Sequence, residues 1–430
     1  MNTQFVCNTE AFGNVKRQNM LENLHVNISG DNIATRYALF NLIGLGIGNI
    51  NWFLGTTSNE KPPAETILNH IRQLSPSANI KLYDSILIDS LAYDDGVTIE
   101  TSLNIKDLQK SIHFCLSTSS TFISARHDAT IYRDFSTNKR RRKKIDFNIS
   151  PYDYSCQADI SYKFSQAING ILAANLCRKK AFLLEEQNEQ PLLNGQIILP
   201  IKKRKKENNK TNALVIGAGG IGTFAMLTLA YLGYKTIDVI DFDDVERKNL
   251  NRQVLYAGAE GTQKAQTASN LLEKWFKLNS NGYNIKLGHD NFDILKETIP
   301  KGNYNSMLCC VDNFKARRVI SALAYKTNSH LIEGGCDSFM GVTSQYVPSH
   351  SHTIKCQRRL KGKKDPKVSQ SCTEQVNPSV IIPNAAIGTI MAYRSIAPTS
   401  TRNQLIFFDS INNKTFYTST AKTTPCYCRT

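Results

Sequence analysis

Short apolar runs alternate with stretches of helical periodicity in the C-terminal half of the chain. The run Ala213–Ile216 is short and continuously apolar, which predicts a buried strand. Residues Ile221–Leu232 carry apolar side chains near every third or fourth position, which predicts a helix directly after that strand. A further apolar run, Met307–Val311, predicts another buried strand. This alternation predicts an α/β fold with a mainly parallel sheet.

Two other patterns predict elements that complete each half of the chain. Residues Ser161–Leu184 are predicted to form a helix that closes the N-terminal half. Near the C-terminus, the segments Gln404–Asp409 and Lys414–Tyr417 flank the turn-forming pair Asn412-Asn413. Two strand-like runs separated by such a pair predict a β-hairpin.

Glycines at a fixed spacing lie between the first of these strands and its helix. Gly217, Gly219 and Gly222 follow the GxGxxG pattern, with Gly220 between them. Such a turn lets the backbone approach phosphates, and the helix N-terminus offers free N–H groups and a positive dipole. Asp241 follows about 20 residues on, at the end of the next predicted strand, where its carboxylate can accept from ribose hydroxyls. These residues alone fit a generic fold that binds NAD or FAD equally well.

Three further features do not belong to a dehydrogenase and favour ATP. Asn249, Arg252 and Gln253 follow the ribose acid, and Arg252 is placed to reach phosphates. Lys264 leads into a predicted helix, and Asp312 ends a predicted apolar strand. An ATP site needs cations on the triphosphate and a carboxylate for magnesium. Arg252 and Lys264 supply the cations, and Asp312 supplies the carboxylate.

In this order the motifs resemble those of the ubiquitin-like-protein activating enzymes, whose bacterial relatives are the MoeB and ThiF adenylyltransferases. The glycine turn, the ribose acid, the Arg-Gln motif, the lysine and the Asp-Asn strand end span Gly217 to Asn313. The resemblance implies an active adenylation domain that binds ATP and magnesium. Its substrate would be the C-terminal glycine of a ubiquitin-like protein, which would pass through a cysteine thioester to a conjugating enzyme.

The N-terminal half contains a second, weaker copy of the same strand–turn–helix unit. Three pairs of segments match: 28–35 with 216–223, 41–50 with 228–237, and 79–82 with 284–287. The offset is 188 residues in the first pair and 187 in the second, so we expect one residue to be lost between them. The copy predicts two tandem Rossmann-like, ThiF-type units, and chance similarity between two such units is the alternative.

The first copy lacks the residues that an ATP site needs. In this alignment Ser29, Asp31 and Ala34 replace the three motif glycines. An acid at the cradle would repel phosphate. Leu54 stands at the position of the ribose acid. We therefore expect the N-terminal unit to be degenerate as a nucleotide site.

Activating enzymes pair an inactive adenylation domain with an active one, and this chain resembles such a pair fused in one polypeptide. The resemblance implies an inactive domain over residues 1–200, a basic linker over 201–212 and an active domain over 213–430. Such a pseudo-dimer within one chain can act as a monomer. Arg17, in the sequence Lys16-Arg-Gln-Asn, resembles the arginine of the family's Arg-Gln helix. By that resemblance Arg17 is a cation that acts in trans on the transferring α-phosphate, and a surface arginine is the alternative.

Eleven cysteines are scattered without the spacing of a disulfide framework, which favours free thiols in a reducing cytoplasm. Cys372 is the candidate nucleophile. It stands before Thr373 and a Pro-Asn helix start, which resembles the thioester cysteine in the crossover loop of activating enzymes, here residues 349–384. Basic residues between positions 358 and 364 would favour its thiolate. Zinc ligation or no role at all is the alternative.

Cys356, Cys426 and Cys428 are candidate zinc ligands, because relatives carry a zinc knot of two Cys-x-x-Cys pairs. A structural zinc ion takes four ligands. The fourth would be a nearby Cys or His: Cys372, His350 or His352. This chain departs from the pattern, since its terminal pair is Cys-x-Cys and its first pair is reduced to one cysteine. If Cys372 binds zinc, its thioester role fails, and the absence of zinc is the other alternative.

Basic residues exceed acidic residues by 52 to 36, which gives a net charge of +16. Much of the excess lies in the runs 139–144, 202–206 and 355–367. Such runs are usually solvated loops, and no aromatic residues are interleaved, so we do not expect nucleic-acid binding. An acidic protein partner would explain them as well. No apolar run reaches transmembrane length and the chain opens on polar residues, so we expect a cytoplasmic protein without membrane association.

Two other functions stay open. In the first, the chain is an enzyme that stops at the adenylate of a sulfur carrier or a peptide. In the second, the chain is a nucleotide-binding scaffold without turnover. The intact Arg252, Lys264 and Asp312 argue against the scaffold. No fused ubiquitin-like domain is visible, so we expect the partners on other chains. A compact enzyme of this kind resembles bacterial or archaeal ubiquitin-type systems, antiviral conjugation operons among them.

Overall fold

The structure, a computed structural model, describes most of the two halves of the chain. The described residues are 15–55, 60–84, 96–101, 111, 115, 121–125, 130–134, 160–182, 195–197, 212–288, 304–337, 339–348, 351–357, 380–396 and 404–419. The chain divides into two compact units, Met1–Lys203 and Arg204–Thr430. The predicted linker 201–212 lies almost wholly outside the described residues, so its boundaries stay a prediction. No described helix combines the length and the apolar character needed to cross a bilayer.

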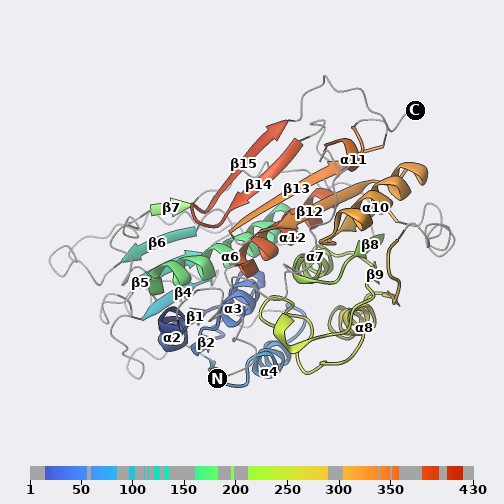
Figure 1. Cartoon of the computed structure of the whole chain (residues 1–430). Coiled ribbons are helices and arrows are strands. Elements are labelled where there is room, and N and C mark those ends of the chain that lie inside the picture. Colours follow the sequence, from blue (N-terminus) through green and yellow to red (C-terminus); the bar gives the residue numbers. More distant parts are fainter. Residues whose placement is uncertain are drawn as a thin grey trace. The chain divides into compact units, whose positions relative to one another are not determined.

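Unit 1 contains, within its described residues, a sheet of seven strands in the order β3-β2-β1-β4-β5-β6-β7. Strands β1 to β5 are parallel, and β6 and β7 run antiparallel to their neighbours. The long helix α6 confirms the helix predicted at Ser161–Leu184. The elements are α2 Val15–Asn23, β1 His25–Ser29, α3 Ile33–Leu45, β2 Asn49–Phe53, α4 Ala64–Leu74, β3 Asn79–Tyr83, β4 Val97–Glu100, β5 Thr121–Ala125, β6 Thr130–Asp134, α6 Ile160–Phe182 and β7 Gly195–Ile197 (Figure 1).

Unit 2 contains, in the part that the structure describes, a sheet of eight strands in the order β10-β9-β8-β11-β12-β13-β14-β15. The first five strands are parallel and the last three antiparallel. The pair β14–β15 confirms the predicted hairpin. The elements are β8 Asn212–Ile216, α7 Gly220–Tyr231, β9 Thr236–Ile240, η2 Arg247–Asn249, α8 Lys264–Phe276, β10 Gly282–Tyr283, β11 Ser306–Cys309, α10 Phe314–Lys326, β12 Leu331–Cys336, β13 Met340–Tyr346, α11 Ile354–Gln357, α12 Ile381–Ile396, β14 Gln404–Asp409 and β15 Lys414–Ser419 (Figure 1).

The two units repeat one topology, which confirms the predicted α/β fold with two Rossmann-like units. In each sheet the third strand in the chain pairs with the second, the second with the first, and the first with the fourth. The backbone repeats as well. The N–H of Gly30 donates to the carbonyl of Phe53 at 2.8 Å, and the N–H of Gly217 donates to that of Ile240 at 2.8 Å. These pairs are related by a constant offset of 187 residues, so the expected loss of one residue between the repeats is wrong.

The corrected register changes how the first copy has lost its nucleotide site. Gly30 stands at the position of Gly217 and shares its positive φ, so the first motif glycine is retained. Asn32 and Thr35 replace the other two glycines. The Asn32 side chain accepts from the Thr35 N–H at 3.2 Å, and the Thr35 hydroxyl accepts from the Asn32 N–H at 3.4 Å. The helix α3 therefore caps its own N-terminus, where an active unit leaves N–H groups free for phosphate.

The acid at this turn does not face an open cradle. Asp31 forms an ion pair of 3.0 Å with Arg36, whose side chain is fully buried. Arg36 also donates to the carbonyls of Glu60 and Pro62. The unit is degenerate as predicted, and the polar side chains at its turn pair with one another and with the backbone.

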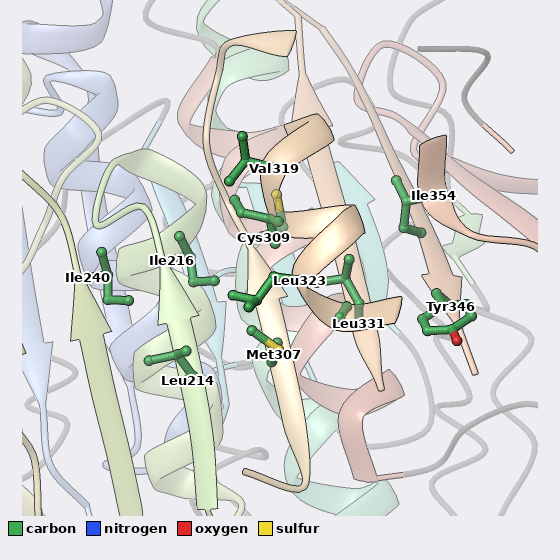
Figure 2. Packing of buried hydrophobic residues seen from close by; sticks show 12 residues of the cluster. Leu214, Ile216, Ile240, Met307, Cys309, Val319, Leu323, Leu331, Tyr346 and Ile354 are labelled. Atoms are coloured by element: carbon green, nitrogen blue, oxygen red, sulfur yellow. The ribbon is translucent and has the colours of Figure 1, made fainter. Parts of the chain in front are cut away.

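The core of unit 2 holds the parallel strands against α10. Leu214 and Ile216 of β8 and Met307 of β11 present apolar side chains on one face of the sheet. Val319 and Leu323 of α10 pack over them (Figure 2). Each fully buried side chain of this size contributes about 1.5–3 kcal/mol. This packing fixes the carboxyl ends of β8, β9 and β11, where polar residues follow.

Candidate active site

A cavity of about 280 Å³ lies at the carboxyl ends of the parallel strands of unit 2. Ligands in open α/β sheets bind at this edge. The cavity brings together nine of the predicted nucleotide-site residues: Gly217, Gly219, Gly220, Asp241, Asn249, Arg252, Gln253, Lys264 and Asp312. Their roles stay predictions, but their separate positions in the sequence converge on one space.

Two of the motif glycines are required by the backbone. Gly217 has a φ of 95° and approaches so closely that a Cβ would lie 2.9 Å from the Cys310 carbonyl oxygen. A Cβ on Gly222 would collide with the Gly217 carbonyl oxygen. Gly219, by contrast, faces open space, since a Cβ there would meet only the Gln253 amide nitrogen, at 3.9 Å. The turn is therefore closed on its inner side and accessible at Gly219, where a phosphate could approach.

Asp241 holds this turn in place. Its carboxylate accepts from the N–H of Ala218 at 2.6 Å and from that of Asp243 at 2.9 Å. Burial raises the pKa of Asp241, and the hydrogen bonds and the charge of Lys264 offset only part of that rise. The buried Tyr256 hydroxyl donates to the Ala218 carbonyl at 2.7 Å. The sequence did not point to Tyr256, because a lone tyrosine in a loop has no motif.

Two cations line the cavity and both are nearly buried. The Arg252 guanidinium donates to the amide oxygens of Asn249 and Asn251, each at 3.0 Å. Because these two acceptors are uncharged, the contacts orient Arg252 without cancelling its charge. The Lys264 side chain is 5% exposed, and its ammonium lies 3.1 Å from the Asp243 carboxylate, which is 49% exposed. Both cations are thus held in position beside the glycine turn.

Asp312 fits the magnesium expected with ATP. It is exposed, follows β11 directly and lines the cavity. Magnesium is commonly bound by one or two carboxylates together with substrate phosphates and water, so a single acid is compatible with it. Asn313 is committed elsewhere, because its side chain caps α10 by accepting from the Ala316 N–H at 2.7 Å.

A buried ion pair under the cavity was not predicted. The Arg317 guanidinium pairs with the fully buried carboxylate of Glu333, which also accepts from the Ser344 hydroxyl at 3.0 Å. Arg317 lines the cavity beside Gly335 and Cys336. Burial raises the pKa of the Cys336 thiol, so it is a poor nucleophile. The sequence offered one signal for this cavity residue, namely an arginine five residues after Asp312.

Several predicted residues are not placed by the structure. Arg17 lies on α2, but its side chain is outside the described part, as are Cys372, Cys426 and Cys428. Most of the predicted crossover loop 349–384 also lies outside it. Cys356 lies on α11, and no group of three metal-ligating side chains occurs among the described residues. Zinc, the thioester cysteine and the cation in trans therefore stay predictions.

Comparison with known proteins gives a family match, and relatives that match over part of their length. A model of the ThiF family matches residues 194–430. SUMO-activating enzyme subunit 2 of Dictyostelium discoideum is 29% identical over 173 residues, which cover 39% of this chain and 25% of that protein. Probable adenylyltransferase/sulfurtransferase MoeZ of Mycobacterium tuberculosis is 32% identical over 145 residues, covering 33% and 36%. The crystal structure of E. coli MccB with MccA-N7isoASN has a TM-score of 0.42 at 19% identity, over 51% of this chain and 66% of that chain. The chain thus spans about a quarter to a third of these curated relatives.

Proposed function

The chain belongs to the ThiF family, and on that premise we propose that its C-terminal unit is an adenylyltransferase that activates a carboxylate with ATP. One observation carries the proposal. The buried cations Arg252 and Lys264 stand beside a glycine turn that is open at Gly219, in the same cavity as Asp241. Cations beside a helix N-terminus suit a polyphosphate, and an acid at the next strand end suits a ribose.

The reaction joins the acyl group to AMP. A carboxylate oxygen of the acyl substrate attacks the α-phosphorus of ATP, the new acyl–phosphate bond forms, and the bond to pyrophosphate breaks. No protein base is needed, because a carboxylate is ionised at neutral pH. Arg252 and Lys264 stabilise the negative charge that moves onto the leaving phosphates. Asp312 would hold magnesium, which supplies further neutralisation of the phosphates.

We propose as acyl substrate the C-terminal glycine of a ubiquitin-like protein. The relatives named as SUMO-activating enzyme subunits support this substrate class. In the complete cycle Cys372 takes the acyl group from the adenylate as a thioester, AMP leaves, and a conjugating enzyme receives the acyl group. This second step depends on one cysteine.

A sulfur carrier is the second candidate substrate. The relative named as an adenylyltransferase/sulfurtransferase favours it. In that case the adenylate is the end product of this chain, and Cys372 has no part in the reaction. A thioester that depends on Cys372 separates the two candidates.

The test uses the purified full chain, MgATP and a glycine-ending ubiquitin-like protein from the same source. The mixture is run on a non-reducing gel with the variants Cys372→Ala and Lys264→Ala. A reducible band that both variants lose supports adenylation followed by transfer to Cys372. Pyrophosphate exchange that needs Lys264 but gives no band supports the second candidate. Neither exchange nor band with any such partner contradicts the proposed function.

A further inference from the structure

Helix α12 is held against the glycine-turn helix by contact between backbones. A Cβ on Gly388 of α12 would strike the carbonyl oxygen of Ile221 and lie 2.8 Å from the nitrogen of Ala225, both on α7. On another face of α12, Ile387 and Met391 fill the space beside Gly334 of β12. A helix fixed on two faces presents its remaining side chains in defined positions.

Asn384 lies one turn before Gly388 and therefore on the same face of α12. It lines the cavity, and a Cβ on Gly220 would collide with its amide nitrogen. Its side chain is thus set over the first turn of α7. Asn384 is 6% exposed, yet no hydrogen bond joins its amide to any partner in the part of the chain that the structure describes.

A second amide faces the same turn, and its oxygen is buried without a partner among the described residues. Gln253 is 5% exposed, and its Oε1 atom has no hydrogen-bond partner among the described residues. Its amide nitrogen is the nearest group to the open side of Gly219. Buried amides without partners are rare, because each unsatisfied group costs about 1–3 kcal/mol. The stranded Gln253 oxygen and the unpartnered Asn384 amide line the same cavity of the described structure, and together they indicate a ligand that supplies their partners.

The chemistry of a carboxamide restricts what that ligand is. Each amide carries one acceptor oxygen and an NH₂ donor. Phosphate oxygens accept hydrogen bonds but, when ionised, donate none, so the triphosphate satisfies only the donors. The ribose hydroxyls are donors, but the acid that suits them is Asp241, at the end of the next strand. A peptide main chain offers both N–H and C=O and matches a carboxamide completely.

We propose that Asn384 binds the main chain of the peptide whose carboxylate is activated, at the unit next to the reacting carboxyl group. The inference rests on the proposed function and gives a substrate-binding role to a residue that is not among the predicted nucleotide-site residues. Asn384 would position the acyl substrate over the glycine turn. It would not contribute to nucleotide affinity.

The test compares two stable ligands, 5′-O-sulfamoyladenosine and the same molecule acylated with glycylglycine. Their affinities for the full chain are measured by calorimetry with wild type, Asn384→Ala and, as a control, Thr389→Ala. Thr389 is a buried polar residue of the same helix that does not line the cavity. We expect Asn384→Ala to weaken the glycylglycyl ligand by roughly three- to tenfold, the loss of one hydrogen bond, and to leave sulfamoyladenosine unchanged. Thr389→Ala should change the two affinities by the same factor.

A third ligand locates the contact. Methylation of the glycylglycine peptide nitrogen removes the N–H, so it should weaken binding to wild type but not to Asn384→Ala. Equal losses for both ligands in Asn384→Ala would overturn the proposal and make the residue a structural support of the turn. Unchanged binding of both ligands in that variant would overturn it as well. If wild type binds neither ligand, the proposed function fails, and the residue's role fails with it.

Discussion

Replacing Lys264 with alanine should separate catalysis from stability. The lysine is almost completely buried, lines the cavity and pairs with Asp243 at 3.1 Å. It is the second of the two cations that the proposed reaction places on the phosphates. Its loss removes a fixed positive charge from a site where the substrate carries four negative ones.

The expected losses of stability and of rate differ, because Lys264 has different partners in the two cases. Its partner in the folded protein is Asp243, and its partner in the proposed reaction is a phosphate. Asp243 is half exposed, so water can solvate it when the lysine is gone, and the folded unit should lose about 1 kcal/mol or less. For a phosphate bound in the cavity, water does not replace the fixed charge of Lys264 in the same way. Removing one preorganised group that stabilises developing charge costs about 10²- to 10³-fold in rate, or roughly 3–4 kcal/mol. Activity should therefore collapse while the protein stays folded.

The assay is ATP–pyrophosphate exchange at saturating acyl substrate, with urea unfolding measured on the same preparations. Lys274→Ala is the matched control, since Lys274 lies on the same helix α8, is exposed and does not line the cavity. We expect Lys264→Ala to lose at least a hundredfold in exchange and Lys274→Ala to stay near wild type. Exchange within threefold of wild type in Lys264→Ala would contradict a catalytic role for this lysine, as would a loss explained by unfolding.

Three further predictions test the supports of the site. Arg317→Ala should destabilise unit 2 by about 3–5 kcal/mol in urea unfolding, because it strands the buried Glu333 carboxylate, and Arg317→Met with Glu333→Gln should recover much of it; a cost below 1 kcal/mol contradicts the pair. Because burial raises the pKa of Asp241 in the folded protein, wild-type stability should fall as pH rises above about 4 and through that raised pKa, and Asp241→Asn should lose this dependence while binding ATP more weakly. Parallel stability curves for the two proteins above about pH 4 would argue against it. Gly388→Ala should cost about 1–3 kcal/mol, since its Cβ meets the α7 backbone, and a neutral effect in thermal unfolding would disprove that packing.

Local sequence patterns were sufficient to predict those elements whose conformation depends on their own residues. The apolar runs and the helical period located β8, α7 and β11, and the Asn-Asn pair located the hairpin. The glycine turn and Lys264 carried chemistry at recognisable spacing, and the structure gathers them around one cavity. These features could be predicted because strand, turn and helix follow one another directly in the chain.

Contacts between distant elements could not be predicted in this way. The position of Asn384 over Gly220 depends on how closely α12 packs against α7, and Gly388 sets that distance. The pairing of Arg317 with Glu333 joins a helix to a neighbouring strand. The repeat was visible in sequence, but its register was misread by one residue near Ser29, because weak similarity does not distinguish adjacent alignments. The equivalent backbone hydrogen bonds of Gly30 and Gly217 determine the correct alignment.

Isotope exchange into ATP shows whether unit 2 transfers AMP to a C-terminal carboxylate. Radiolabelled pyrophosphate is incubated with the full chain, MgATP and the glycine-ending protein, either with its free carboxylate or with the same terminus converted to an amide. We expect label in ATP only with the free carboxylate, and none with Lys264→Ala. Label that appears equally with the amidated protein, or without any acyl substrate, would contradict it.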